Sequence, residues 1–226
     1  VAISATLGGT AMVEKEAMTL AFSGASARMI LIFGLTVFVA FHIRQAFDQK
    51  EIDVLLSRPM SRFQIMLSYW MGFSCVSFLL ALVTVAILSF LPILSLEGFF
   101  WWGLSLLLES WLMVAIVLFA SFALSSAVTS VMAAMGLYIG GRMMAFFIAT
   151  SDSHMVLHEQ WVNAITSFII NTVSIIMPRL DLFTQSEWLV YGLKRPEDVT
   201  FAIVQAIIYI PLLLAAATID FKRKEF

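Results

Sequence analysis

The sequence predicts an all-α polytopic membrane protein, and three observations lead to this fold class. Hydrophobic residues make up 61% of the 226 residues and charged residues 12%, whereas soluble domains average ~45–50% and ~25%. The mean hydropathy is +0.97. The apolar residues gather in stretches of ~20 residues, the length of a helix that crosses a bilayer. This composition excludes a soluble enzyme, a nucleic-acid-binding domain and a disordered chain.

Five stretches have the length and composition of membrane-spanning helices. Pro92 is expected to end the second, and the aromatic run 99–102 opens the third at the lipid–water boundary. Because no repeat or flexible linker divides the sequence, residues 1–226 are expected to form a single transmembrane domain. The expected spans are about 20–43, 65–91, 101–124, 127–149 and 199–219.

The distribution of basic residues predicts how these spans are oriented. Short cytoplasmic segments carry an excess of Lys and Arg. The segment 44–64 and the tail after the fifth span hold seven of the 13 basic residues, so we assign both to the cytoplasm. The long segment 150–198 has three basic residues against six acidic ones and is expected outside. Five spans that end inside must begin outside, and the C-terminus is then cytoplasmic.

Two stretches complicate this count of spans. Since the chain begins outside at Val1, we expect a preceding first helix to be mostly missing from this sequence, with 1–7 as its outer end. Residues 161–177 are apolar on average but carry a polar stripe at helical spacing. We expect this stretch to form an amphipathic or re-entrant helix on the outer face rather than a further crossing.

The cytoplasmic segment 44–64 is too polar to cross a bilayer. Its apolar residues gather on one side of a short helix, and its acidic residues precede its basic ones, an order that favours the helix dipole. Pro59 is expected to end this helix at or before Arg58, and Ser61 is placed to cap the next one. The residues alone leave two interpretations open, a simple interfacial connector or a docking helix.

The stretch Glu51-Ile-Asp-Val-Leu-Leu-Ser-Arg-Pro-Met-Ser-Arg62 resembles the linker between the second and third helices of ABC-2-type transporter permeases. Members of that family typically carry an acidic residue, a run of leucines and then Pro-x-Ser-Arg. The basic ending 221–226, and 177–183 followed by Trp188, are also similar to that family. The resemblance covers essentially the whole chain and implies a six-helix permease bundle.

The resemblance also implies a mechanism, in which the linker is a coupling helix that docks in a groove of a separate ATP-hydrolysing subunit. Two such ATPase subunits would bind ATP and magnesium, and two permease copies, identical or related, would form the substrate path in a bacterial cytoplasmic (inner) membrane. Apolar anchors and a polar rim would make the docking contact. The residues implied are Glu51, Ile52, Asp53, Leu55, Leu56, Arg58, Pro59 and Arg62.

The sequence has no G-x-x-x-x-G-K-[ST] motif, so we expect no nucleotide site, no cofactor and no enzymatic activity in this chain. Membrane lipid is an expected partner and nucleic acid is not. An ATP-independent carrier or channel is one alternative function, and a structural or assembly subunit of a membrane complex is another. The identity of the transported substrate stays open.

Two ionisable residues are expected deep in the membrane, where charge is costly. Glu109 is eight residues after the outer end of the third span, and Arg142 is seven residues before the outer end of the fourth. At ~1.5 Å per residue, both lie roughly 10–12 Å from the outer boundary. We therefore predict a Glu109–Arg142 ion pair, which either pins the two helices or lines the substrate route. Arg28 and His42 are expected near the ends of the first span, within reach of the interface.

Two further patterns indicate a packing face and a candidate metal site. Ala133, Gly136 and Gly140 form a small-residue face on the fourth span, which predicts close helix packing. His154 and His158 lie one helical turn apart, but with no evident third ligand we interpret them as solvated histidines rather than a metal site.

Overall fold

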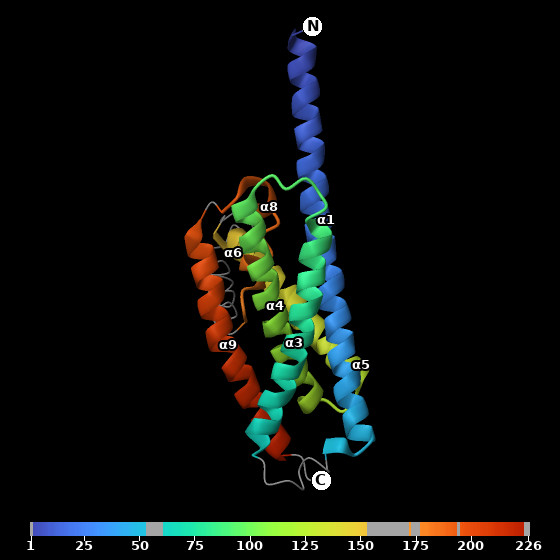
Figure 1. Ribbon diagram of the computed structural model, residues 1–226. Helices are drawn as coiled ribbons and strands as arrows, with labels where there is room; N and C mark the ends of the chain where they lie inside the picture. The colour runs from blue at the N-terminus through green and yellow to red at the C-terminus, as the bar shows by residue number, and fades with distance from the viewer. Residues whose placement is uncertain (1, 53–60, 153–171, 173–176, 194, 224–226) are drawn as a thin grey trace.

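The computed structural model describes residues 2–52, 61–152, 172, 177–193 and 195–223, and the regular elements among them are all helical (Figure 1). The expected all-α class is therefore confirmed over this part of the chain. The elements are α1 (Ala2–Asp48), α3 (Arg62–Leu88), α4 (Leu96–Ala123), α5 (Ala127–Arg142), α6 (Met144–Asp152), the 3₁₀ turn η1 (Leu180–Leu182), α8 (Trp188–Tyr191) and α9 (Pro196–Arg223).

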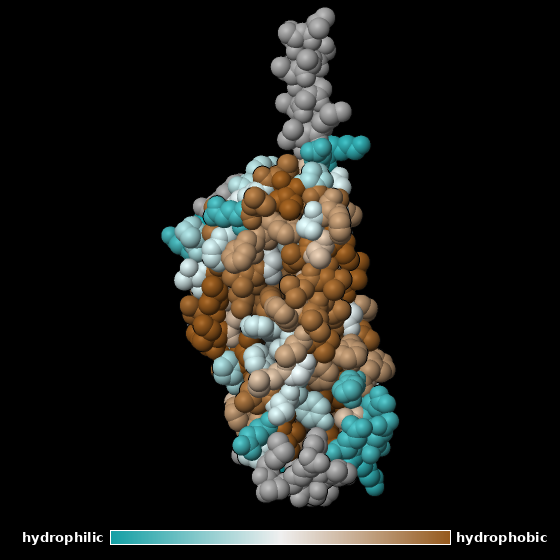
Figure 2. Space-filling model, in the orientation of Figure 1, coloured by the Kyte–Doolittle hydropathy of each residue, from teal (hydrophilic) through white to brown (hydrophobic). Residues whose placement is uncertain are grey.

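Four of these helices contain a segment long and apolar enough to cross a membrane, as a polytopic membrane protein requires. The space-filling view shows the corresponding apolar belt, with hydrophilic residues gathered at its two ends (Figure 2). The four segments are Lys15–Asp48, Arg62–Leu88, Leu96–Ala123 and Pro196–Phe221.

The helix α4 is the centre of the bundle, and α1, α3, α5 and α9 all pack against it. Its residues 112–118 are each no more than 1% exposed. The neighbouring helices α3 and α9 turn a larger share of their apolar residues outward. Side chains of α4 are thus placed where several helices can reach them at once.

Two expected boundaries are wrong. Residues 2–7 do not close a separate preceding helix, because they belong to α1, which runs unbroken from Ala2 to Asp48. The expected fourth span over 127–149 is divided into α5 and α6 at Met143. With 16 residues, α5 alone is shorter than the ~20 residues of a full crossing.

The division at Met143 follows from close packing around Gly141. A Cβ atom there would lie 2.7 Å from the carbonyl oxygen of Pro178, so the chain before η1 approaches α5 more closely than any larger residue permits. Glycine also weakens a helix interior. The helix consequently ends one residue later, at Arg142, and α6 begins at Met144.

The described parts of the two basic segments lie at the same end of the bundle, which we name the basic end. The last turn of α1, the first turn of α3 and the last turn of α9 meet there (Figure 1). Ser61 caps α3 as predicted: its hydroxyl accepts from the Gln64 backbone N–H, and the Gln64 side chain accepts from the Ser61 N–H. At the opposite end, the start of α4 lies beside α8.

Candidate functional site

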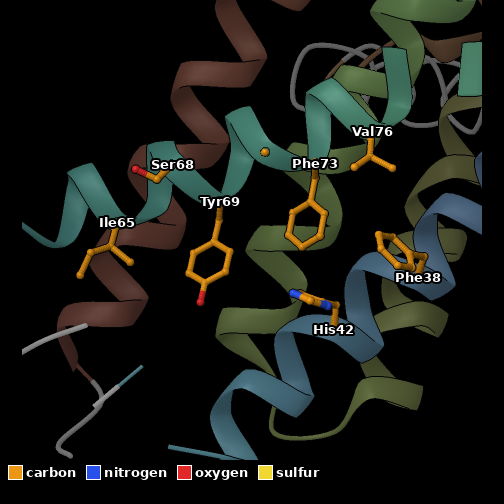
Figure 3. Close-up of a pocket in the computed structure, with 8 residues that line it drawn as sticks. Phe38, His42, Ile65, Ser68, Tyr69, Phe73 and Val76 are labelled. Carbon is orange, nitrogen blue, oxygen red and sulfur yellow. The ribbon is translucent and has the colours of Figure 1, made fainter. Parts of the chain in front are cut away.

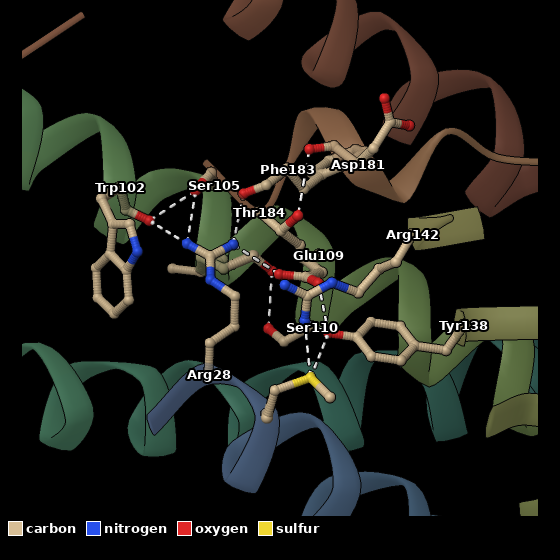
Figure 4. A network of polar contacts seen from close by, with 12 residues as sticks. Arg28, Trp102, Ser105, Glu109, Ser110, Tyr138, Arg142, Asp181, Phe183 and Thr184 are labelled. Atoms are coloured by element: carbon tan, nitrogen blue, oxygen red, sulfur yellow. Dashed lines mark hydrogen bonds and ion pairs between the residues drawn. The ribbon is translucent and has the colours of Figure 1, made fainter. Parts of the chain in front are cut away.

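A buried ion pair joins α1 to the middle of α4. The Nη1 atom of Arg28 lies 2.6 Å from Oε2 of Glu109, and both side chains are 0% exposed (Figure 4). Breaking a buried pair of this kind by removing one partner is strongly destabilising, because the other charge is left without compensation. The pair therefore holds the two helices in one register.

Arg28 also reaches a segment that is distant in the sequence. Its Nη1 donates to the carbonyl oxygen of Phe183 at 2.5 Å, directly after η1. Its Nη2 donates to the Ser105 hydroxyl at 2.9 Å and to the Trp102 carbonyl at 3.2 Å. The guanidinium lies 4.8 Å from the centroid of the Trp102 ring, in cation–π contact. One cation thus ties α1, α4 and the segment around η1 together.

The predicted ion pair between Glu109 and Arg142 is wrong, because the partner of Glu109 is Arg28. Glu109 pairs with Arg28, and the Tyr138 hydroxyl stands between Glu109 and Arg142: it donates to Oε1 of Glu109 and accepts from Nη1 of Arg142, at 3.0 Å in each case (Figure 4). Arg142 also contacts the sulfur of Met29. Both predicted residues belong to one network on α1, α4 and α5, joined through a residue that the prediction did not include.

The expected interfacial position of Arg28 is also wrong, whereas His42 is exposed. The sequence does contain a signal that could have indicated the true partner. Arg28 follows the expected outer end of its span by eight residues, the same count that placed Glu109, but the prediction did not use this equality of depth. Tyr138 carries no charge, and the sequence contains no comparable signal for it.

The expected small-residue face is only partly used in packing. Gly136 is exposed, with open space where a Cβ would lie, while a Cβ on Gly140 would lie 2.8 Å from the Met177 side chain. Ala133 is half-buried. Two glycines lie against a backbone carbonyl: Gly141, described above, and Gly98, whose Cβ would overlap the Trp188 carbonyl where α8 meets α4.

The structure describes three of the eight residues assigned to coupling. Glu51 is exposed, as a docking rim requires, but Ile52 is 1% exposed and packs in the hydrophobic core. Its expected role as a docking anchor is therefore wrong, because contacts within the bundle already bury it. Arg62 donates to the carbonyl oxygen of Phe221 and lies over its ring. Outside the described residues lie Asp53, Leu55, Leu56, Arg58 and Pro59.

Four aromatic rings connect the helices at the basic end. Phe122, near the end of α4, meets Phe47 of α1 at 5.3 Å and Phe221 of α9 at 5.1 Å between ring centroids, both edge-to-face. Tyr69 of α3 is 6.5 Å from the same ring. Such pairs add stability beyond the area that they bury. The cluster of Phe47, Tyr69, Phe122 and Phe221 therefore links α1, α3, α4 and α9 beside the segment that joins α1 to α3.

The described residues include no group of three or more His, Cys, Asp or Glu that could hold a metal ion. The histidines weighed as metal ligands, His154 and His158, and the stretch 161–177, except for residues 172 and 177, lie outside that part of the chain.

Comparison with known proteins identifies no relative: no protein-family model and no curated protein sequence matches this chain.

Proposed function

We propose that the chain is the permease subunit of an ABC-2-type exporter. In this role it forms the membrane path and is driven through the segment 44–64 by a separate ATPase subunit. The resemblance of Glu51–Arg62 to the coupling linker of that family supports the proposal, as does the all-helical architecture with its four apolar, membrane-length segments.

The observation that carries the proposal is the set of contacts around the segment between α1 and α3. Phe47 and Arg62 flank this segment, and both contact the ends of other helices, Phe122 of α4 and Phe221 of α9. A force applied to the segment would therefore reach four helices through packed rings rather than through a flexible loop. A coupling element needs this property and a simple connector does not.

The buried core position of Ile52 changes the proposed docking surface. Docking on the ATPase is then assigned to exposed Glu51 and to Asp53, Leu55, Leu56, Arg58 and Pro59, which lie outside the described residues. Arg62 and Ile52 serve as the attachment of that surface to the bundle. One set of residues in this short segment then docks on the ATPase, and another set transmits the ATPase's motion to the bundle.

The rest of the assembly follows from the same proposal. Two ATPase subunits bind ATP and magnesium, a second permease copy completes the path, and the basic end with the C-terminus faces the cytoplasm of a bacterium. The Arg28–Glu109 pair lies away from the basic end and holds α1 on α4. Motion imposed at the basic end would then be a tilt of α1 about this fixed contact.

The test uses the full chain, co-expressed with the ATPase subunit encoded nearest to it. A variant carrying Leu55→Asp and Leu56→Asp is expected to lose ATPase co-purification and permease-stimulated ATP hydrolysis while remaining in the membrane. The matched control carries Leu94→Asp and Leu96→Asp, which replace two exposed leucines at the opposite end, and is expected to keep both. If no ATPase associates, or the first variant couples normally, the carrier and scaffold alternatives replace this proposal.

A further inference from the structure

A groove of about 440 Å³ lies between α1 and α3, on the side of the bundle near the basic end (Figure 3). The part of α3 that lines it runs from Ile65 to Val76, so it begins ~5 Å and ends ~20 Å from the first residue of α3. Its volume falls within the ~300–1,000 Å³ of small-molecule sites.

The wall of this groove is an ordered set of aromatic rings. Phe73 is 6% exposed and is held edge-on by Phe38 at 6.0 Å and by His42 at 5.5 Å between ring centroids. Tyr69 lies nearly parallel to Phe73, with centroids 6.3 Å apart and an interplanar angle of 18°. Rings fixed against one another in this way present flat faces and edges to a bound molecule.

Two polar groups in the groove have no hydrogen-bond partner among the described residues, the Tyr69 hydroxyl and the His42 imidazole. Figure 3 shows both projecting into the space between α1 and α3. Each lies roughly 10 Å from its helix end at the basic side. His42 is exposed and Tyr69 is half-buried, so both groups are accessible to a bound molecule. A ligand that carries a hydrogen-bonding group would find a partner in each of them.

We propose that this groove binds an uncharged, flat aromatic molecule that carries one hydrogen-bonding group. Its ring system would lie against Tyr69 and Phe73, and its polar group would meet His42 and the Tyr69 hydroxyl. No Asp, Glu, Lys or Arg is among the described residues that line the groove, so its wall favours an uncharged ligand. The inference rests on the proposed function only in calling such a ligand a cargo that enters from the leaflet at the basic end.

Gly72 leaves space in the groove, so a larger side chain at this position can test whether a ligand binds there. It lines the groove, and no atom lies within 4 Å of the position that its Cβ would take. A phenylalanine there fills the groove without forcing α3 away from its neighbours. Gly34 of α1 is the matched control: it also has open space, and it lines a second groove of about 620 Å³ that contains Phe90 but no histidine or tyrosine among its described residues.

The experiment measures 2-naphthol binding by equilibrium dialysis against the full chain in phosphatidylcholine nanodiscs, with empty nanodiscs as the background. Wild type is expected to show saturable binding above this background. Gly72→Phe is expected to weaken it at least tenfold, and Gly34→Phe to change it less than twofold. Binding that is not saturable, or that is equal in the two glycine variants, overturns the proposal.

A second comparison tests the polar half of the site. The double variant His42→Phe/Tyr69→Phe keeps the rings and removes both polar groups, so it is expected to weaken 2-naphthol binding at least fivefold while binding naphthalene as wild type does. If 1-decanol displaces 2-naphthol as well as unlabelled 2-naphthol does, the groove is a seat for acyl chains and the proposal is wrong. The assay contains no ATPase subunit, so its outcome is independent of the proposed coupling.

Discussion

Arg28 and Glu109 face one another with 2.6 Å between Nη1 and Oε2, and neither side chain is exposed. The carboxylate balances one positive charge, and the Tyr138 hydroxyl connects it to a second cation, Arg142. The three ionised groups of this network therefore carry one more positive than negative charge. The network is a candidate for stability experiments because each member has a defined and different partner.

Replacing Glu109 with glutamine is expected to lower the free energy of unfolding by about 3–5 kcal/mol, because Arg28 loses its counter-ion in a buried site. Unfolding in mixed micelles with increasing SDS measures this difference. Glu97→Gln is the control on the same helix: Glu97 is exposed in the first turn, and its replacement should stay within ~0.5 kcal/mol of wild type. Equal stability of the two variants would show that the ion pair contributes nothing.

Tyr138→Phe is expected to cost about 1–3 kcal/mol, since it removes the hydroxyl that Glu109 and Arg142 both use. Arg142→Gln should then add less destabilisation in the Tyr138→Phe background than in wild type, with a coupling free energy above ~0.5 kcal/mol. A double-mutant cycle under the same unfolding conditions measures this coupling. Strict additivity would mean that Tyr138 does not connect the two ionised groups.

Gly98→Ala is expected to destabilise by about 1–3 kcal/mol, because the added Cβ overlaps the Trp188 carbonyl and forces α8 from α4. Gly136→Ala is the matched control on another helix. It has open space and is expected to stabilise the protein by ~0.5–1 kcal/mol through the better helix propensity of alanine. Thermal unfolding of the two variants should therefore shift in opposite directions, and a shared direction would contradict the packing described at Gly98.

Ser61→Ala is expected to lower stability by about 1 kcal/mol, because the first turn of α3 loses the hydroxyl that caps it. Ser126 precedes α5 in the same position but makes no side-chain cap hydrogen bond, so Ser126→Ala should stay within ~0.5 kcal/mol of wild type. Hydrogen exchange of the first amides of each helix gives a local measurement. Faster exchange in α3 alone is the expected result.

The long helices could be predicted from the sequence because hydropathy over ~20 residues is a local property. The expected spans 65–91 and 101–124 match α3 and α4 within a few residues. The division at Met143 could not be predicted in this way. It depends on a contact between Gly141 and Pro178, and residues far apart in the sequence make such contacts only after the bundle has formed.

The candidate site was predicted in part, for a related reason. Counting residues from the expected span ends placed Glu109 and Arg142 at one depth, and both do lie in the network. Depth alone does not state which faces of the helices meet, so the direct partner was wrong. Ile52 shows the same limit, since its side chain suits a docking surface and a core equally well, and only the packing decides between them.

The separation of Arg28 from its partners has a consequence for biogenesis. The ribosome completes Glu109 81 residues after Arg28, and Phe183 155 residues after it. At a translation rate of ~5–20 residues per second, Glu109 is synthesised roughly 4–16 s after Arg28, and Phe183 about 8–30 s after it. During this interval α1 has inserted with an unpaired charge, which favours its retention beside the insertion machinery until α4 arrives. We therefore expect the ion pair to act also as a checkpoint in membrane assembly, and variants without Glu109 should be released late and become early targets of membrane proteolysis.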